Sequence, residues 1–235
     1  MQAELQTALF QAFDTLNLQR VKTFSVPPVT LCGLGALGAC GQEAQARGVS
    51  HLFVMVDSFL HQAGMTAPLA RSLAIGAIAM IGKSLPKAVG YGHDLAAREN
   101  MLLASCMAGM AFSSAGLGLC HAMAHQPGAA LHIPHGQANA MLLPTVMGFN
   151  RMVCRERFSQ IGRALTNKKS DDRDAIAAVC ELIAEVGQSK RLADAGAKPE
   201  HYSAWAQAAL EDICLRSNPR TATQAQIIDL YAAAG

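Results

Sequence analysis

Charged and aromatic residues are scarce in this 235-residue sequence, at 15% and 5% of the chain. The net charge is only +2, and the Lys and Arg residues are scattered along the chain. A nucleic-acid platform needs a basic face and aromatic rings for stacking, so we expect no nucleic-acid partner. The chain is long enough to bury a substantial core, in one large domain or two small ones.

The seven cysteines include no Cys-x-x-Cys pair, and the sequence starts with MQAELQ, which has neither a basic nor an apolar leader. Single cysteines of this kind are typical of reduced thiols, so we expect a cytoplasmic protein. Residues 101–120 carry no charge and are long enough to cross a bilayer. They are rich in Ala, Gly and Ser and lack flanking anchors, which favours a wholly buried helix and no membrane partner.

Strand signals are confined to the first quarter of the chain. Residues 21–57 predict an extended segment, a helix and then a buried strand at 51–57, as at the start of an α/β sheet. Gly33, Gly35 and Gly38 match the dinucleotide-binding pattern G-x-G-x-x-G, although an Ala- and Gly-rich stretch forms such triplets by chance. On spacing alone, a plain turn into a helix is the better interpretation.

Residues 2–17 and the chain from Leu73 onward carry helical patterns. Residues 2–17 form an amphipathic pattern, which is interpreted either as a helix packed on the rest of the protein or as a helix that docks on a partner. Ser170 and Thr223 are predicted N-caps. The later helices are predicted at 71–85 ended by Pro86, 94–112, 116–125 ended by Pro127 and Gly128, 136–149 interrupted by Pro144, 151–165, 171–186, 199–215 and 223–233.

Four of the eight histidines lie in the stretch 120-CHAMAHQPGAALHIPHG-136. His121 and His125 are four residues apart, so on a helix they share one face. His135 lies between Pro134 and Gly136, and we expect a tight turn that returns its imidazole toward that helix. This arrangement is typical of a site for Fe, Zn, Ni or Cu, although two ligands alone make a loose site. Structural histidines with satisfied hydrogen bonds are the alternative.

The stretch 109-GMAFSSAGLGLCHAMAHQPGAALHIPHGQANAMLLP-144 resembles a signature of the iron-dependent (group III) alcohol dehydrogenases, in which A-G-L-G, H-x-x-A-H-x-x-G, P-H-G and L-L-P follow one another. The resemblance extends to 73-LAIGAIAMIGKSLPKAV-89 and 218-NPRTAT-223. Residues 24–41 and 51–57 are similar to the start of that family. The sequence is nearest in character to the alcohol dehydrogenases of ethanolamine utilization.

The resemblance implies that His121 and His135 are metal ligands and that His125 lies beside the nicotinamide and assists proton transfer. His132 has no counterpart role. Asp57 matches the acid near the adenosine ribose, which favours NAD over NADP because a carboxylate repels a 2′-phosphate. The implied cofactors are NAD and Fe²⁺, with Zn²⁺ as the alternative, and the implied substrate is a short aldehyde such as acetaldehyde or its alcohol.

Several motifs of the family are missing. The Gly-Gly-Gly-Ser pyrophosphate loop, the P-T-T-x-x-T-G-S-E stretch, and the Asp and His that complete the metal site have no counterpart, and no spacing argument places Asp94 or His93 there. A large internal segment is predicted to be absent at Ser72–Leu73. We therefore expect weakened iron and NAD binding, and an exposed interdomain face that favours a homo-oligomer.

The expected fold is mainly α. It has an amphipathic helix at 1–20, a truncated remnant of an α/β nucleotide-binding domain at 21–72, and a helical metal-binding domain at 73–235. Three functions remain open: an impaired iron alcohol dehydrogenase, a non-catalytic assembly protein, or the functionless product of a deleted gene. The assembly protein would bind a bacterial microcompartment shell or one of its enzymes through residues 2–17.

Overall fold

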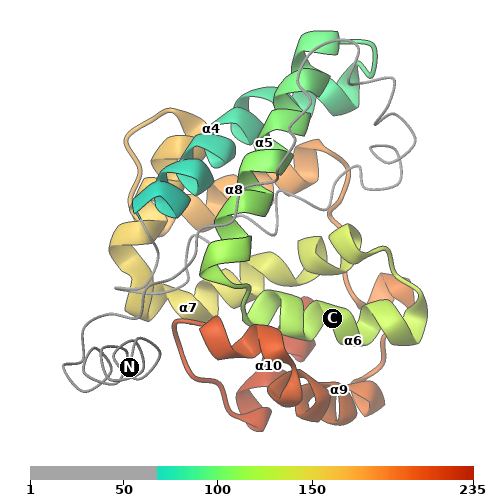
Figure 1. The fold of residues 1–235 in the computed structure, drawn as a ribbon. Coiled ribbons are helices and arrows are strands. Elements are labelled where there is room, and N and C mark those ends of the chain that lie inside the picture. Colours follow the sequence, from blue (N-terminus) through green and yellow to red (C-terminus); the bar gives the residue numbers. More distant parts are fainter. Residues whose placement is uncertain (1–67) are drawn as a thin grey trace, which may run out of the picture.

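The computed structural model describes residues 68–235, and these residues form helices with no β-strand among them (Figure 1). The α-helices are α4 (Pro68–Gly90), α5 (Leu95–Ala115), α6 (Leu119–Leu131), α7 (His135–Thr166), α8 (Asp174–Glu185), α9 (Pro199–Glu211) and α10 (Gln224–Ala234). Two short 3-10 helices, η1 (Ala193–Ala195) and η2 (Ile213–Ser217), precede and follow α9. The predicted helical domain is confirmed. The predictions for residues 2–17, 21–57 and Asp57 fall outside the described part of the chain, and the domain boundaries stay a prediction.

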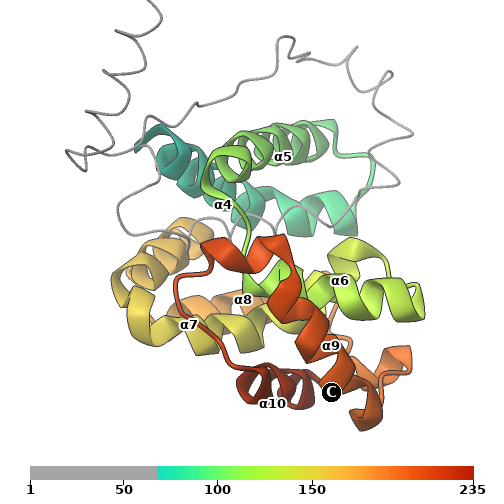
Figure 2. The same cartoon turned by 60° about the horizontal axis from the view of Figure 1, so that its bottom comes forward.

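The long helix α7 lies at the centre of the domain. It contacts α4 and α8 on one side and α6 and α10 on the other. Helices α4 and α5 form a hairpin that packs on α7 from one end of the molecule, whereas α6, α9 and α10 make a second layer (Figures 1 and 2). This second layer carries the histidine stretch.

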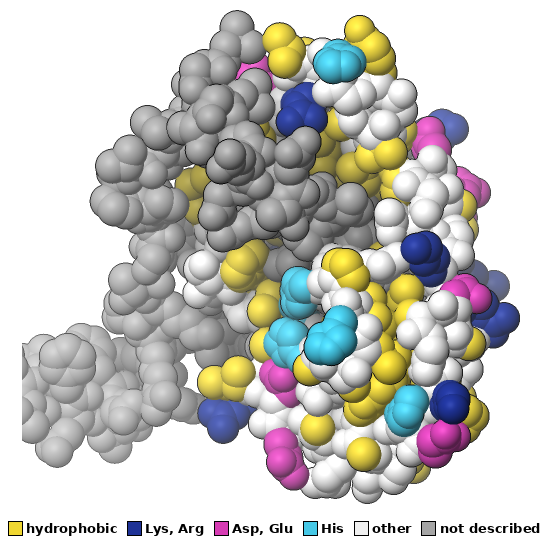
Figure 3. All heavy atoms as spheres, turned by 90° about the vertical axis from the view of Figure 1, so that its right-hand side faces the viewer, with side chains coloured by type: hydrophobic (Ala, Val, Ile, Leu, Met, Phe, Trp, Pro, Cys, Tyr) yellow, Lys and Arg dark blue, Asp and Glu magenta, His cyan; other side chains and the backbone are white. Residues whose placement is uncertain are grey.

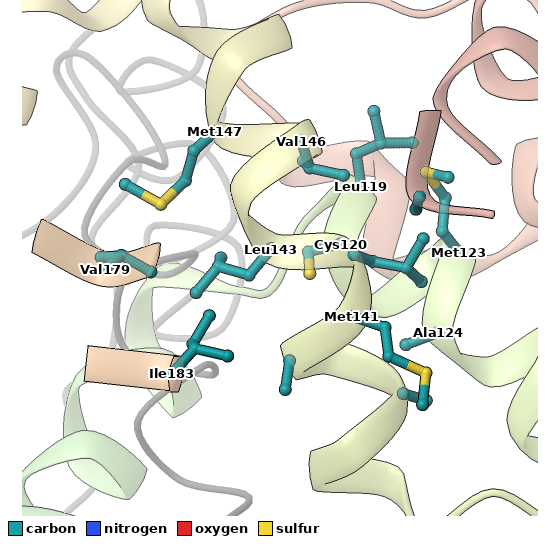
Figure 4. Packing of buried hydrophobic residues seen from close by; sticks show 14 of the residues in the cluster. Leu119, Cys120, Met123, Ala124, Met141, Leu143, Val146, Met147, Val179 and Ile183 are labelled. Carbon is teal, nitrogen blue, oxygen red and sulfur yellow. The ribbon is translucent and has the colours of Figure 1, made fainter. Parts of the chain in front are cut away.

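The core lies where α6, α7 and α8 meet, and Figure 4 shows their apolar side chains pointing into it. These helices have wide apolar faces because buried positions recur every three or four residues. The side chains at this junction include Leu119, Cys120 and Met123 of α6, Leu143, Val146 and Met147 of α7, and Val179 and Ile183 of α8. All of α6 from Leu119 to Ala124 is buried, so its histidines are anchored from within the core.

Pro86 and Pro127 do not end their helices as predicted, and Pro144 does not interrupt its helix. Pro86 lies inside α4, Pro127 inside α6 and Pro144 inside α7. A proline inside a helix removes one backbone hydrogen bond, at a cost of about 3 kcal/mol in an isolated helix, and only surrounding packing offsets that cost. The break in α7 occurs instead at Cys154, whose φ of −132° and ψ of 21° are not helical.

Helix α5 is not wholly buried, which corrects the prediction for residues 101–120. Only one face is buried, formed by Ala97, Ala104, Ala108 and Ala111, whereas Leu103 is 41% exposed. Small side chains on this face let α5 pack against α4. Among the described helices, α4 between Ala70 and Gly90 is long and apolar enough to cross a membrane, a property that buried helices of soluble proteins share.

Two predicted caps have different outcomes. Thr223 caps α10 as predicted, because its hydroxyl accepts the Gln226 N–H while the Gln226 side chain accepts the Thr223 N–H. The prediction for Ser170 is wrong. Asp171 serves the start of α8 instead, since its carboxylate accepts the N–H groups of Arg173 and Asp174 at 2.7 and 3.0 Å.

Candidate metal centre

The start of α6 is held by the segment that follows η2. Gly118 at the N-cap has no side chain to bond the first helical N–H groups, and Asn218 Oδ1 accepts the Leu119 N–H at 3.1 Å. The Asn218 amide also pairs with Asn150 of α7 through two hydrogen bonds of 3.0 Å. Ser217 donates a hydrogen bond to the carbonyl of Leu117. The 218-NPRTAT-223 motif thus fixes α6 against α7.

A residue of α10 supplies the hydrogen bond that the proline inside α6 cannot make. Pro127 has no N–H to give to the carbonyl of Met123, four residues earlier. The Tyr231 hydroxyl donates to that carbonyl at 2.7 Å instead. Tyr231 is fully buried, and this burial raises the pKa of its phenol, so the hydroxyl keeps its proton for the bond. The helix therefore runs on to Leu131 and ends at His132, which has left-handed backbone angles (φ 55°, ψ 32°).

Three histidines converge at the junction of α6 and α7. His121 and His125 lie on α6, and His135 is the first residue of α7, where a turn was predicted. The ring centres are 5.3 Å apart for His121 and His135, 5.6 Å for His125 and His135, and 6.3 Å for His121 and His125. His121 is buried whereas His135 is exposed, so the group opens to solvent at one side. Figure 3 shows histidine side chains gathered on one face beside an acidic side chain.

The spacing of the His121 and His135 rings matches that of two imidazoles on one divalent metal ion. Two imidazoles that bind one ion at about 2.0–2.1 Å have ring centres on the order of 5 Å apart. The observed 5.3 Å agrees with that spacing. Asn139 orients His135, because its amide nitrogen donates to the His135 carbonyl at 2.9 Å and lies 3.3 Å from His135 Nε2. Two nitrogens still make only half of a four-ligand site.

His125 is paired with an acid that the sequence did not reveal. Its Nδ1 lies 2.7 Å from Oδ2 of Asp212, at the end of α9. Burial alone would raise the pKa of Asp212, but the hydrogen bonds from His125 and from the Cys214 N–H outweigh it and lower the pKa. The ionised carboxylate only accepts hydrogen bonds, so Nδ1 carries the proton and Nε2 is left for other contacts.

The other candidates from the sequence have different places. His132 is exposed at the end of α6. Asp94 is the N-cap of α5, where its carboxylate accepts the Ala97 N–H at 2.9 Å. Asp212 and Cys214 were missed because they lie in a predicted helix at 199–215, and Asp212 is 87 residues from His125. No local spacing signal links residues so far apart.

The fold and the histidine cluster together define a helical domain with a candidate metal centre. Residues 47–235 match the sequence profile of the Fe-containing alcohol dehydrogenase family, C-terminal. The chain is 60% identical to the probable alcohol dehydrogenase EutG of Salmonella typhimurium and 51% identical to that of Escherichia coli K12, and each alignment covers both chains from end to end. The chain belongs to the Fe-containing alcohol dehydrogenase family.

Solved structures agree with this membership. A 1,3-propanediol oxidoreductase matches 81% of this chain with a TM-score of 0.77 and 35% identity. A sulfoacetaldehyde reductase of Bifidobacterium kashiwanohense in complex with NAD+ matches 80% of it with a TM-score of 0.72 and 25% identity. This chain spans about half the length of either structure, at 51% and 49%.

The EutG alignments also bear on the predicted internal gap. The alignment with the Salmonella protein has 395 positions and this chain has 235 residues, so at least 160 positions (395 less 235) have no residue of this chain. That difference agrees with the absence of a large internal segment. The roles predicted for His121, His125 and His135 stay predictions that the geometry supports.

Proposed function

We propose that this chain reduces a short aldehyde, such as acetaldehyde, to its alcohol with NADH during ethanolamine breakdown in the bacterial cytoplasm. The observation that carries the proposal is the convergence of His121, His125 and His135, with ring centres 5.3 to 6.3 Å apart. Membership of the family supports iron, and the NAD+-bound relative supports the nucleotide. The likeness to the probable alcohol dehydrogenase EutG supports an alcohol and its carbonyl compound as the substrates.

His121 and His135 would hold the divalent ion, Fe²⁺ or alternatively Zn²⁺. When bound, such an ion supplies Lewis-acid polarisation of a carbonyl oxygen. His125 then holds or moves the proton that the alcohol oxygen requires. Asp212 keeps the His125 ring in one orientation and one tautomer, with Nδ1 protonated and Nε2 available to the substrate. Asp57 is proposed to bind the adenosine ribose of NAD.

The proposed activity is low, because only half of the metal ligands are present in this chain. Loss of even an outer partner of a metal ligand typically weakens metal binding by about 10–100-fold, and the loss of direct ligands costs more. Iron should therefore bind reversibly, and the rate should rise with iron concentration. NAD binding should also be weak, because the loop that holds the pyrophosphate in the family has no counterpart in this sequence.

The test is acetaldehyde-dependent NADH oxidation by the full chain after anaerobic loading with Fe²⁺. We expect a slow rate above that of buffer, which His121→Ala abolishes. His132→Asn is the matched control and keeps the rate, because Asn tolerates the left-handed backbone at the end of α6. A wild-type rate equal to that of iron and buffer alone would refute the proposal.

A second candidate is a non-catalytic helical protein that binds a microcompartment shell, or an enzyme inside it, through residues 2–17. The gap of at least 160 alignment positions favours the loss of catalysis, and the binding through residues 2–17 rests on their amphipathic pattern. Deletion of residues 1–20 should then abolish co-localisation with the shell. Unchanged localisation would reject this candidate and would leave the enzymatic proposal standing.

A further inference from the structure

Three different kinds of metal-binding side chain meet beside the histidine pair. They are His125 on α6, Asp212 after α9 and Cys214 in η2, and one ligand atom of each lies within 4.8 Å of the other two. All three residues are partly buried, so an ion could reach them from solvent. The set includes neither His121 nor His135. It is therefore distinct from the pair that fits the metal of the family.

The backbone holds these three side chains in place. Asp212 is the N-cap of η2, and its Oδ1 accepts the Cys214 N–H at 2.8 Å. This bond leaves Oδ2 directed toward His125 Nδ1, 2.7 Å away. The cap also fixes the position of Cys214 two residues later. In this way a single aspartate connects the thiol of η2 with the imidazole of α6.

The donor set suits zinc better than ferrous iron. Zinc is bound in proteins by thiolate sulfur, imidazole nitrogen and carboxylate oxygen, and open sites have three protein ligands and one solvent position. Thiolates select soft and borderline ions, and at a given site zinc binds more tightly than Fe²⁺ in the order of divalent metals. The His121 and His135 pair offers nitrogen alone.

We propose that His125, Asp212 and Cys214 form a second divalent-metal site, which takes zinc through one sulfur, one nitrogen and one oxygen ligand. Binding replaces the hydrogen bond between His125 and Asp212 with bonds from both to the ion. The ion then occupies Nδ1, the Cys214 thiol releases its proton to solvent, and the His125 ring keeps its single proton on Nε2. The ring cannot take up a second proton, so Nε2 no longer accepts a proton and passes it on. Zinc at this site thus inhibits the proposed aldehyde reduction even while iron is bound to His121 and His135.

The test is a titration of the metal-free, reduced full chain with Co²⁺, a spectroscopic substitute for zinc. We expect a thiolate-to-cobalt charge-transfer band in the near ultraviolet that saturates at one equivalent and disappears when zinc is added. Cys214→Ser should remove the band and weaken zinc binding by at least about 10–100-fold. Cys180→Ser is the matched control and should keep the band, because Cys180 is an exposed thiol on α8.

His121→Ala separates this proposal from the enzymatic one. It should abolish the iron-dependent rate and leave the cobalt–thiolate band unchanged. A band that persists in Cys214→Ser, or that is lost in His121→Ala, overturns the proposed ligand set. X-ray absorption of the zinc-loaded wild type needs no variant: one sulfur at about 2.3 Å is expected, and a shell of nitrogen and oxygen alone refutes the site.

Discussion

The α4–α5 hairpin and the layer formed by α6, α9 and α10 are held together by different kinds of contact. The hairpin packs mainly through small apolar side chains, with a side-chain hydrogen bond from Asn100 to Ser84 at 3.2 Å. The other layer is tied by long-range polar bonds, such as Tyr231 to the Met123 carbonyl and Asn218 to Asn150. Specific polar bonds fix the position of a helix more narrowly than apolar contact does.

The surfaces of the two regions differ in the same way. Several large apolar side chains of the hairpin and its connection are exposed: Val89, Tyr91, Leu95 and Leu103. In the other layer, the aromatic rings of Tyr202, Trp205 and Tyr231 pack on one another at 5.6 to 6.1 Å. The helix positions are thus fixed most firmly in the layer that carries the histidines. Substitutions in the hairpin should therefore leave the geometry of the site unchanged.

Asn218→Ala should show the difference most strongly. It removes the partner of the buried Asn150 amide and of the Leu119 N–H, and each orphaned buried group costs about 1–3 kcal/mol, so a loss of about 2–6 kcal/mol in unfolding free energy is expected. Urea denaturation followed by circular dichroism measures it. Asn100→Ala in the hairpin is the control and should cost only about 0.5–1.5 kcal/mol. Equal losses would remove the distinction between the regions.

Gly82→Ala tests a close backbone contact of the hairpin with α7. A Cβ at Gly82 would lie 2.1 Å from the Leu165 carbonyl oxygen, so α4 must move, and overpacking of this kind costs about 1–3 kcal/mol. Gly148→Ala on the exposed side of α7 meets nothing within 4 Å and should stabilise the helix by up to about 1 kcal/mol. Thermal melting of both variants gives the comparison. A neutral Gly82→Ala would show that the hairpin shifts freely.

Tyr231→Phe tests the bond that replaces the one lost at Pro127. It leaves the Met123 carbonyl without its donor, which should cost about 1–3 kcal/mol of unfolding free energy. The control is the same change in a Pro127→Ala background, where the restored N–H can bond Met123 within the helix. The cost of Tyr231→Phe should then fall toward zero in urea titrations. Additive effects of the two substitutions would contradict this explanation.

The sequence predicted those features that depend on near neighbours. The helices from Leu73 onward follow from their apolar periodicity, and His121 and His125 share a face because they are four residues apart. The length of α6 could not be predicted, because Pro127 normally ends a helix and its compensating donor, Tyr231, is 108 residues from Met123. Asp212 was missed for the same reason. Both depend on contacts that exist only after the chain has folded.

Asp171→Ala at the start of α8 should have the smallest effect, a fall of a few degrees in melting temperature at pH 7. Asp171 accepts the backbone N–H groups of Asp174 and Arg173, and it is fully exposed, so solvent screens part of its contribution. Ser170→Ala is the control. It should leave the melting temperature unchanged, because Ser170 bonds only the carbonyl of Asp171 and no N–H of the helix.

The effect of Asp171 should also depend on pH in one direction. The hydrogen bonds from the backbone of Asp174 and of Arg173 lower the pKa of the Asp171 carboxyl, so folding favours its ionised form. Its contribution is complete above the ordinary aspartate pKa of about 3.9 and is lost as the pH falls through the lower pKa of the folded state. The difference in melting temperature between wild type and Asp171→Ala should therefore be constant from pH 7 to pH 5 and should shrink in stronger acid. A difference that grows in acid would contradict this explanation, because it would mean that the protonated carboxyl stabilises α8 more than the ionised one.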